Sequence, residues 1–181
     1  YLTIQSRKKK SLLEGVLKKL LKSNFMEKVK IMGVLNLTPD SFYDGHAQNL
    51  SNQECLKKKI EELSASDIID VGCESSRPGA NSISIDSEIH RLSLLDSIIG
   101  DFNNCFSIDT YKYQVAERAL KNGFQMVNDI YAGRYDDNKM FEVVANFNVP
   151  IVLMHMKGAP LNMQENIKYD SLIDDILYFF D

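Results

Sequence analysis

The sequence lacks several features that define familiar classes of protein. It has no tryptophan and only three cysteines in 181 residues, and Cys55, Cys73 and Cys105 lie far apart with no C-x-x-C pair. This pattern offers no metal-ligand spacing and is typical of a reducing cytosol. No apolar run approaches the roughly 20 residues that a membrane-spanning helix needs. We therefore expect a cytoplasmic protein with no membrane-spanning segment.

Positive charge is scarce outside the first 28 residues. Residues 1–28 hold eight Lys+Arg against Glu14 and Glu27, whereas the remaining residues hold 13 Lys+Arg against 23 Asp+Glu. An acidic body disfavours nucleic acid as a partner. Leucines recur at helical spacing among the lysines of residues 1–28, which predicts a basic amphipathic leader or linker helix. A membrane-surface helix is the alternative, but the absence of Trp, the scarcity of Arg and Glu14 favour a linker.

Residues 29–181 repeat one pattern: a short β-branched run, a polar loop, then a helix. The runs lack strict alternation, which is typical of parallel strands covered on both faces. Expected strands are 29–36, 67–73, 104–109, 125–130 and 149–155. Expected helices cover about 51–64, 84–99, 112–121 and 138–147, with a last one from about 171.

Five such units predict a parallel α/β sheet with right-handed crossovers. Two architectures fit, an open doubly wound sheet and a (β/α)8 TIM barrel of about 250 residues. No glycine-rich dinucleotide motif follows the first strand, which weakens the doubly wound alternative. Five units are too few to close a barrel, so on that interpretation this chain holds only about the first five β-α units.

Small polar side chains follow the expected strands where ligands gather in both architectures. Asp109 and Asn128 emerge from apolar strands, so each needs hydrogen-bond partners, which a planar heterocycle with N–H donors and ring acceptors would supply. The alternative is that they cap helices or bond to the backbone. Arg77 suits a phosphate or carboxylate but is also compatible with a solvated surface position. Asn36 offers a hard oxygen for Mg²⁺ bound to substrate phosphate.

Two loop sequences carry a family resemblance. The segments "MGVLNLTPDSFYDG" and "IIDVGCESSRPGA" closely resemble the paired motifs of dihydropteroate synthases, and "FSIDT", "MVNDI" and "VLMHM" fall where the next three strands of that family should lie. The resemblance spans about residues 29–181, leaving 1–28 as a separate leader. It implies a (β/α)8 barrel that condenses 6-hydroxymethyl-7,8-dihydropterin pyrophosphate with 4-aminobenzoate, giving 7,8-dihydropteroate and pyrophosphate.

The resemblance also implies roles for individual positions. Asp109 and Asn128 would grip the pterin, Arg77 would join them in catalysis, and Asn36 would meet Mg²⁺ on the pyrophosphate. The implied substrate-binding positions are Thr38, Pro39, Phe42, Ser76, Arg77, Pro78, Asp109, Asn128, Ile130 and Met154. No protein nucleophile is required, because the amine of 4-aminobenzoate attacks and pyrophosphate is already a good leaving group.

Departures from the family pattern qualify these expectations. Cys73, Ser76 and His46 replace a usual Gly, Thr and Gly, and the later family motifs are absent. We therefore expect weak or no synthase activity from these 181 residues alone, with a homodimer for the full-length protein and fusion to a pterin pyrophosphokinase as further expectations. Two alternatives stay open: a methyltetrahydrofolate-type methyltransferase, and a remnant that binds pterin without turnover.

Overall fold

The computed structural model describes residues 29–38, 53–75, 82–158, 162–163 and 167–180. These residues belong almost entirely to one compact unit, Ile31–Asp181. The expected leader helix in residues 1–28 lies outside the described residues. Within the described part of the chain, no helix is both long and apolar enough to cross a membrane.

All five expected strands are present, and each is somewhat shorter than predicted. They are β1 (Met32–Asn36), β2 (Ile68–Gly72), β3 (Cys105–Asp109), β4 (Met126–Asp129) and β5 (Ile151–Leu153). The late start of β5 has a simple cause, because Pro150 has no N–H to donate to the neighbouring strand. Its carbonyl still accepts from the N–H of Val127 at 3.1 Å.

In the described part of the chain, five α-helices alternate with or follow the strands. They are α2 (Gln53–Glu62), α3 (Ile85–Leu92), α4 (Tyr113–Lys121), α5 (Lys139–Phe147) and α6 (Leu172–Phe179). Four match the expected positions closely, and α4 ends as predicted at Asn122, followed by Gly123 with φ +97°. The expectation of one continuous helix over 84–99 was wrong. Ser93 Oγ donates to the His90 carbonyl at 2.7 Å, and short 3-10 turns follow in place of the α-helix.

The sheet runs in the order β1-β2-β3-β4-β5, with every pair parallel. A doubly wound sheet reverses its strand order at a switch point, whereas a barrel adds each strand beside the previous one. The sequential order therefore supports the barrel alternative. Among the described residues, β1 and β5 each pair with a strand on one side only.

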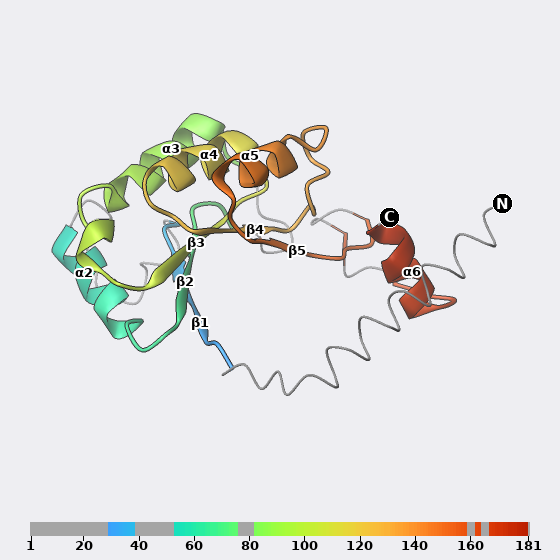
Figure 1. Ribbon diagram of the computed structural model, residues 1–181, viewed down its shortest axis with the longest axis horizontal. Helices are drawn as coiled ribbons and strands as arrows, with labels where there is room; N and C mark the ends of the chain where they lie inside the picture. Colours follow the sequence, from blue (N-terminus) through green and yellow to red (C-terminus); the bar gives the residue numbers. More distant parts are fainter. Residues whose placement is uncertain (1–28, 39–52, 76–81, 159–161, 164–166, 181) are drawn as a thin grey trace. The chain divides into compact units, whose positions relative to one another are not determined.

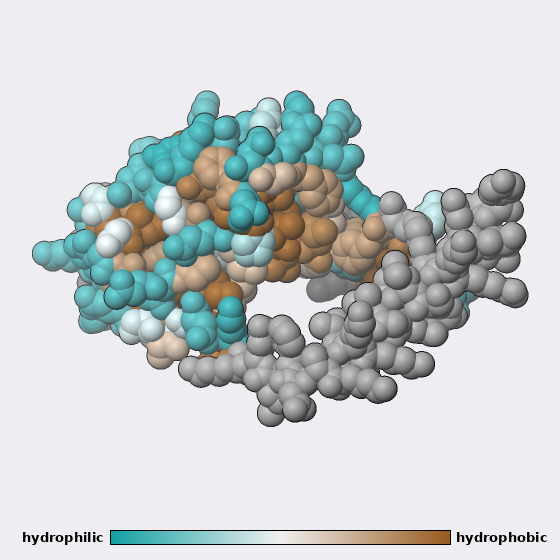
Figure 2. Space-filling model, viewed as in Figure 1, coloured by the Kyte–Doolittle hydropathy of each residue, from teal (hydrophilic) through white to brown (hydrophobic). Residues whose placement is uncertain are grey.

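The main core lies between the strands and helices α2 to α5. Helices α3, α4 and α5 lie together on one side of the sheet (Figure 1). Leu35, Val71 and Ile108 face them and are at most 3% exposed. The outer side of this helix layer is mainly hydrophilic, and hydrophobic residues gather along the sheet below it (Figure 2). On the opposite strand face, Val34 in β1 and Val152 in β5 are 60% and 38% exposed.

Candidate active site

One row of residues crosses the carboxyl ends of the strands. The register pairs Asn36 with Gly72, Gly72 with Asp109, Asp109 with Asn128 and Asn128 with Val152. Three of the residues singled out from the sequence therefore lie side by side on β1, β3 and β4. Because side chains alternate along a strand, all members of this row project from the face of the sheet opposite the helix layer. The structure thus brings Asn36, Asp109 and Asn128 to one edge of the sheet.

Three other expected site residues lie just past the strands. Thr38 is buried beyond β1, and Ile130 lines a small cavity beside Asp109. Met154 follows β5 and donates its backbone N–H to the Asp129 carbonyl at 3.2 Å, which ties it to the end of β4. The remaining predicted substrate-binding residues lie outside the described residues: Pro39, Phe42, Ser76, Arg77 and Pro78.

Asp109 stands in a strongly acidic environment. Burial, together with the negative charges of neighbouring carboxylates, among which Asp70 contributes most, raises its pKa to about 7. A carboxyl group in this state carries a proton for part of the time near neutral pH. It is therefore best stabilised as an anion by a ligand that brings N–H donors or positive charge.

A buried ion cluster of Lys112, Glu74 and Glu88 lies near Asp109. Lys112, which is 3% exposed, donates to the carboxylate of Glu74, to Glu88 Oε2 at 2.7 Å and to the Ile83 carbonyl at 2.8 Å. Burial alone would lower the pKa of Lys112, but its hydrogen bonds to Glu74 and Glu88 outweigh burial, and the pKa is raised. The cluster thus connects the end of β2 to α3 and to the start of α4.

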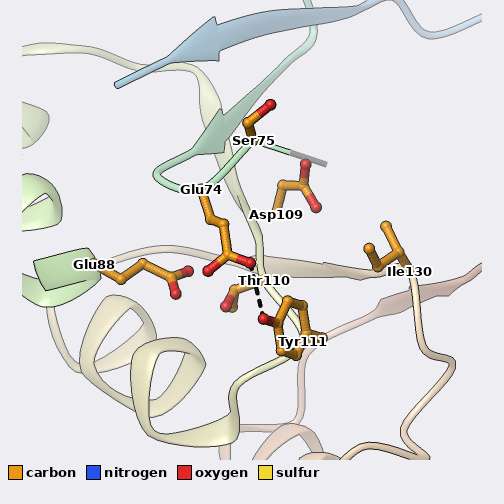
Figure 3. A pocket seen from close by; sticks show the side chains of 7 residues that line it. All are labelled: Glu74, Ser75, Glu88, Asp109, Thr110, Tyr111 and Ile130. Carbon is orange, nitrogen blue, oxygen red and sulfur yellow. Dashed lines mark hydrogen bonds between the residues drawn. The ribbon is translucent and has the colours of Figure 1, made fainter. Parts of the chain in front are cut away.

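The same cluster forms one wall of a cavity of about 20 Å³, roughly the space of a single water molecule. Figure 3 shows the side chains that line it, among them Glu74, Asp109 and Tyr111, which follow the ends of β2 and β3. Tyr111 Oη donates to Glu74 Oε1 at 2.8 Å. Glu74 also accepts the backbone N–H of Ile83 at 3.1 Å, so its carboxylate is held from three sides.

Sequence reasoning missed Asp70, Gly72 and Lys112 as parts of this site. A signal for Asp70 was present, because it interrupts the apolar run "DIIDVGC" just as Asp109 interrupts "FSID". Lys112 gave no such signal, since a lysine at the start of a helix is normally solvated. Its burial follows from the acidic residues that α3 and the β2 loop bring to it.

Gly72 creates room between two oxygens that could serve a metal ion. A Cβ placed on Gly72 would lie 3.1 Å from Asn36 Oδ1 and 3.6 Å from Asp109 Oδ2. Mg²⁺ prefers hard oxygen ligands and usually takes only one or two from the protein when substrate phosphates supply others. No group of three or more His, Cys, Asp or Glu that could hold a metal occurs among the described residues. These residues therefore fit an ion that arrives with a phosphate ligand, not a preformed all-protein metal site.

Fold and site together define a class of protein. Polar side chains converge at the carboxyl ends of consecutive parallel strands, where α/β barrels bind and transform small molecules. The sequence matches the family described as "Pterin binding enzyme" over residues 32–181. The chain belongs to this pterin-binding enzyme family.

The relatives share much of their sequence with this chain. A dihydropteroate synthase of Clostridium beijerinckii is 42% identical over 157 residues, which cover 85% of this chain and 55% of that protein. A mitochondrial folate synthesis bifunctional protein of Arabidopsis thaliana is 39% identical over 84% of this chain and 28% of its own length. Among solved structures, a dihydropteroate synthase of Clostridium difficile matches with a TM-score of 0.73 at 35% identity, covering 87% of this chain and 57% of that one.

These matches settle the choice of architecture. The fold class is the (β/α)8 barrel, of which the described residues supply five consecutive parallel strands. The chain spans about half the length of the dihydropteroate synthases it matches.

Proposed function

We propose that this chain functions as a dihydropteroate synthase. Such an enzyme joins 6-hydroxymethyl-7,8-dihydropterin pyrophosphate to 4-aminobenzoate. The observation that carries the proposal is the register pairing of Asp109 with Asn128 at the carboxyl ends of β3 and β4. The solved relatives support it by their ligands. The Clostridium difficile enzyme was crystallised in the presence of pteroic acid, and the Burkholderia cenocepacia enzyme is complexed with 7,8-dihydropteroate.

On this proposal, Asp109 and Asn128 recognise the pterin ring. The Asp109 carboxylate accepts N–H groups of the ring, and these charge-assisted bonds offset the burial that raises its pKa to about 7. Ile130, which lines the adjoining cavity, and Met154, at the end of β5, supply apolar contacts beside the ring. The two polar groups bind and orient the ring and take no part in a covalent intermediate.

The reaction needs positioning more than it needs a protein nucleophile. The amine nitrogen of 4-aminobenzoate forms a bond to the methylene carbon of the pterin, the bond from that carbon to the pyrophosphate oxygen breaks, and the amine gives up a proton. Asn36 is the residue that would hold Mg²⁺ beside Gly72. When bound, Mg²⁺ would supply positive charge that offsets the negative charge of the pyrophosphate. Thr38, Pro39, Phe42, Ser76, Arg77 and Pro78 are proposed to enclose the aminobenzoate, with Arg77 opposite negative charge.

The proposed partners follow from the relatives and the composition. Bifunctional folate synthesis proteins among the relatives support fusion to a second enzyme, which we take to be a pterin pyrophosphokinase. We further propose a homodimer for the full-length protein. The three cysteines, Cys55, Cys73 and Cys105, lie far apart in the sequence with no C-x-x-C pair, which favours a reducing compartment, and we propose the cytosol.

Calorimetry on the 181-residue chain tests the proposal. The chain should bind dihydropterin pyrophosphate in the presence of Mg²⁺. The chain with this ligand bound should then bind 4-aminobenzoate. Binding is the primary readout, because the sequence predicts weak turnover for these residues alone. Failure to bind the pterin would overturn the proposal. Binding of the pterin without the aminobenzoate would favour a binding remnant, and methyl transfer to a corrinoid protein would favour the methyltransferase.

A further inference from the structure

Asp70 is a buried carboxylate to which the proposed reaction gives no role. It lies in the middle of β2, is 5% exposed, and shares the strand face of Gly72, two residues further along. Its Oδ2 accepts a hydrogen bond from Asn128 Nδ2 at 2.9 Å. Asp70 therefore contacts one of the two side chains proposed to recognise the pterin ring.

This hydrogen bond spans a strand. Asp70 is on β2 and Asn128 is on β4, and β3 runs between them. Neighbouring strands lie about 4.8 Å apart, so the two side chains reach toward each other over a gap of roughly 10 Å. The register places Ser107 beside Asp70 and Asp109 beside Asn128, so the bond crosses the face of β3 that carries Ser107 and Asp109. Ser107 is fully buried, and its small side chain leaves room for the crossing.

The chemistry of the pair determines how the Asn128 carboxamide is oriented. An ionised carboxylate can only accept, so Asn128 must turn its NH₂ group toward Asp70. The carbonyl oxygen lies on the other side of the same planar group and is therefore directed away from Asp70. We propose that Asp70 is a positioning residue that fixes Asn128 Oδ1 as an acceptor for the pterin, and so makes the site prefer a 2-amino ring over its 2-oxo counterpart.

A second observation argues that Asp70 does not serve stability alone. Its other oxygen, Oδ1, is buried and has no hydrogen-bond partner in the part of the chain that the structure describes. An unpartnered polar atom at such depth destabilises the folded chain, and a charged group does so more strongly. An apolar residue at this position would not carry that cost. A role in arranging the site accounts for a carboxylate here.

The inference rests on the proposed function, because it assumes that the Asp109 and Asn128 pair binds a pterin. Pterin and lumazine provide the test, since they differ by a 2-amino against a 2-oxo group. In Asp70→Asn the new amide can donate as well as accept, so the Asn128 carboxamide is free to turn over. Pterin affinity of the 181-residue chain should fall roughly tenfold while lumazine affinity changes little, so the preference shrinks by about the same factor.

Three further variants distinguish positioning from folding. Asp67→Asn makes the same change just before β2 begins, where Asp67 Oδ2 accepts the Ile31 N–H at 2.8 Å, and should leave the preference unchanged. Ser107→Val fills the space over β3 through which the Asp70–Asn128 hydrogen bond passes, without altering Asp70. It should reproduce the roughly tenfold loss of preference for pterin, whereas Ser107→Ala should retain that preference. Ser107→Val also covers the case in which Asp70→Asn fails to fold.

The outcomes separate this inference from the proposed function. An equal loss of affinity for both ligands in Asp70→Asn, or an unchanged preference in a folded variant, overturns the role of Asp70 while pterin binding by the unaltered chain stands. Failure of the unaltered chain to bind either ligand overturns the proposed function, and this inference falls with it.

Discussion

The buried ion cluster of Lys112, Glu74 and Glu88 should contribute strongly to the stability of the folded chain. Lys112→Met keeps most of the length and apolar character of the side chain but removes its charge. The substitution leaves Glu88, which is 1% exposed, and Glu74 without their cation, and it removes the hydrogen bond of 2.8 Å that Lys112 donates to the Ile83 carbonyl. Removing one partner of a buried ion pair typically costs 3–5 kcal/mol, because the remaining charge is uncompensated. We expect the free energy of unfolding at pH 7 to fall by about 3–5 kcal/mol.

The pH dependence of this loss follows from the charges. The pKa of Lys112 is raised, so its stabilising contribution is complete below its ordinary value of 10.5 and disappears only as pH rises through the higher value in the folded chain. The unaltered chain therefore loses nothing from Lys112 between pH 5 and 8. The loss of stability in Lys112→Met should accordingly be complete throughout this pH range.

Urea denaturation followed by far-UV circular dichroism measures the effect. Lys121→Met is the matched control, because Lys121 pairs with Glu117 at 2.7 Å on an exposed surface, where side chains are 60% and 42% accessible. Such surface pairs contribute less than about 1 kcal/mol, so the control should lose little. The double variant Lys112→Met/Glu88→Leu should recover part of the loss by removing the stranded carboxylate. A loss below about 1 kcal/mol in Lys112→Met, or one equal to the control, would refute the argument.

Three further predictions concern the site and its surroundings. Gly72→Ala inserts a methyl group 3.1 Å from Asn36 Oδ1, so calorimetry should show roughly tenfold weaker binding of pterin pyrophosphate with Mg²⁺; unchanged affinity would contradict a shared site over Gly72. The Asp109 pKa of about 7 lies above its ordinary 3.8, so its ionisation opposes folding increasingly as pH rises between these values. Asp109→Asn should therefore be more stable than the unaltered chain in urea at pH 8 but not at pH 4, and equal stability at both would count against the raised pKa. Burial raises the pKa of the Cys73 thiol, so a thiol reagent should modify Cys55 and Cys105 first in the folded chain. Modification of Cys73 before the other two would contradict its burial.

Much of the fold could be predicted because local sequence and burial agree. Strand runs such as "DIIDVGC" and helix ends such as Asn122–Gly123 carry their own signals, and the structure follows them to within a few residues. The helix expected over 84–99 failed because Ser93 satisfies a backbone carbonyl with its own side chain. Apolar spacing continues through that break, so periodicity alone could not reveal it.

The site was only partly predictable, for a different reason. The positions at strand ends were enough to select Asn36, Asp109 and Asn128 from the sequence. That the three lie in one row depends on the register of the strands, which the sequence alone does not reveal. The Asp70 bond to Asn128 joins residues 58 positions apart over an intervening strand. Similarly, Lys112 is buried only because two acidic residues from other elements meet it.

The charges at this edge of the sheet explain why the proposed reaction needs a cation from elsewhere. Four carboxylates add to the negative charge around Asp109, namely those of Asp70, Glu74, Glu88 and Asp129. The ammonium group of Lys112 already forms ion pairs with Glu74 and Glu88. Such surroundings favour a ring that brings N–H donors and disfavour a pyrophosphate. A substrate with both groups can bind only if its pyrophosphate meets compensating positive charge. Mg²⁺ beside Asn36 and the guanidinium of Arg77 are the two sources that the proposal provides, so the roles of ring-binding carboxylate and pyrophosphate-binding cation are necessarily carried by different parts of the site.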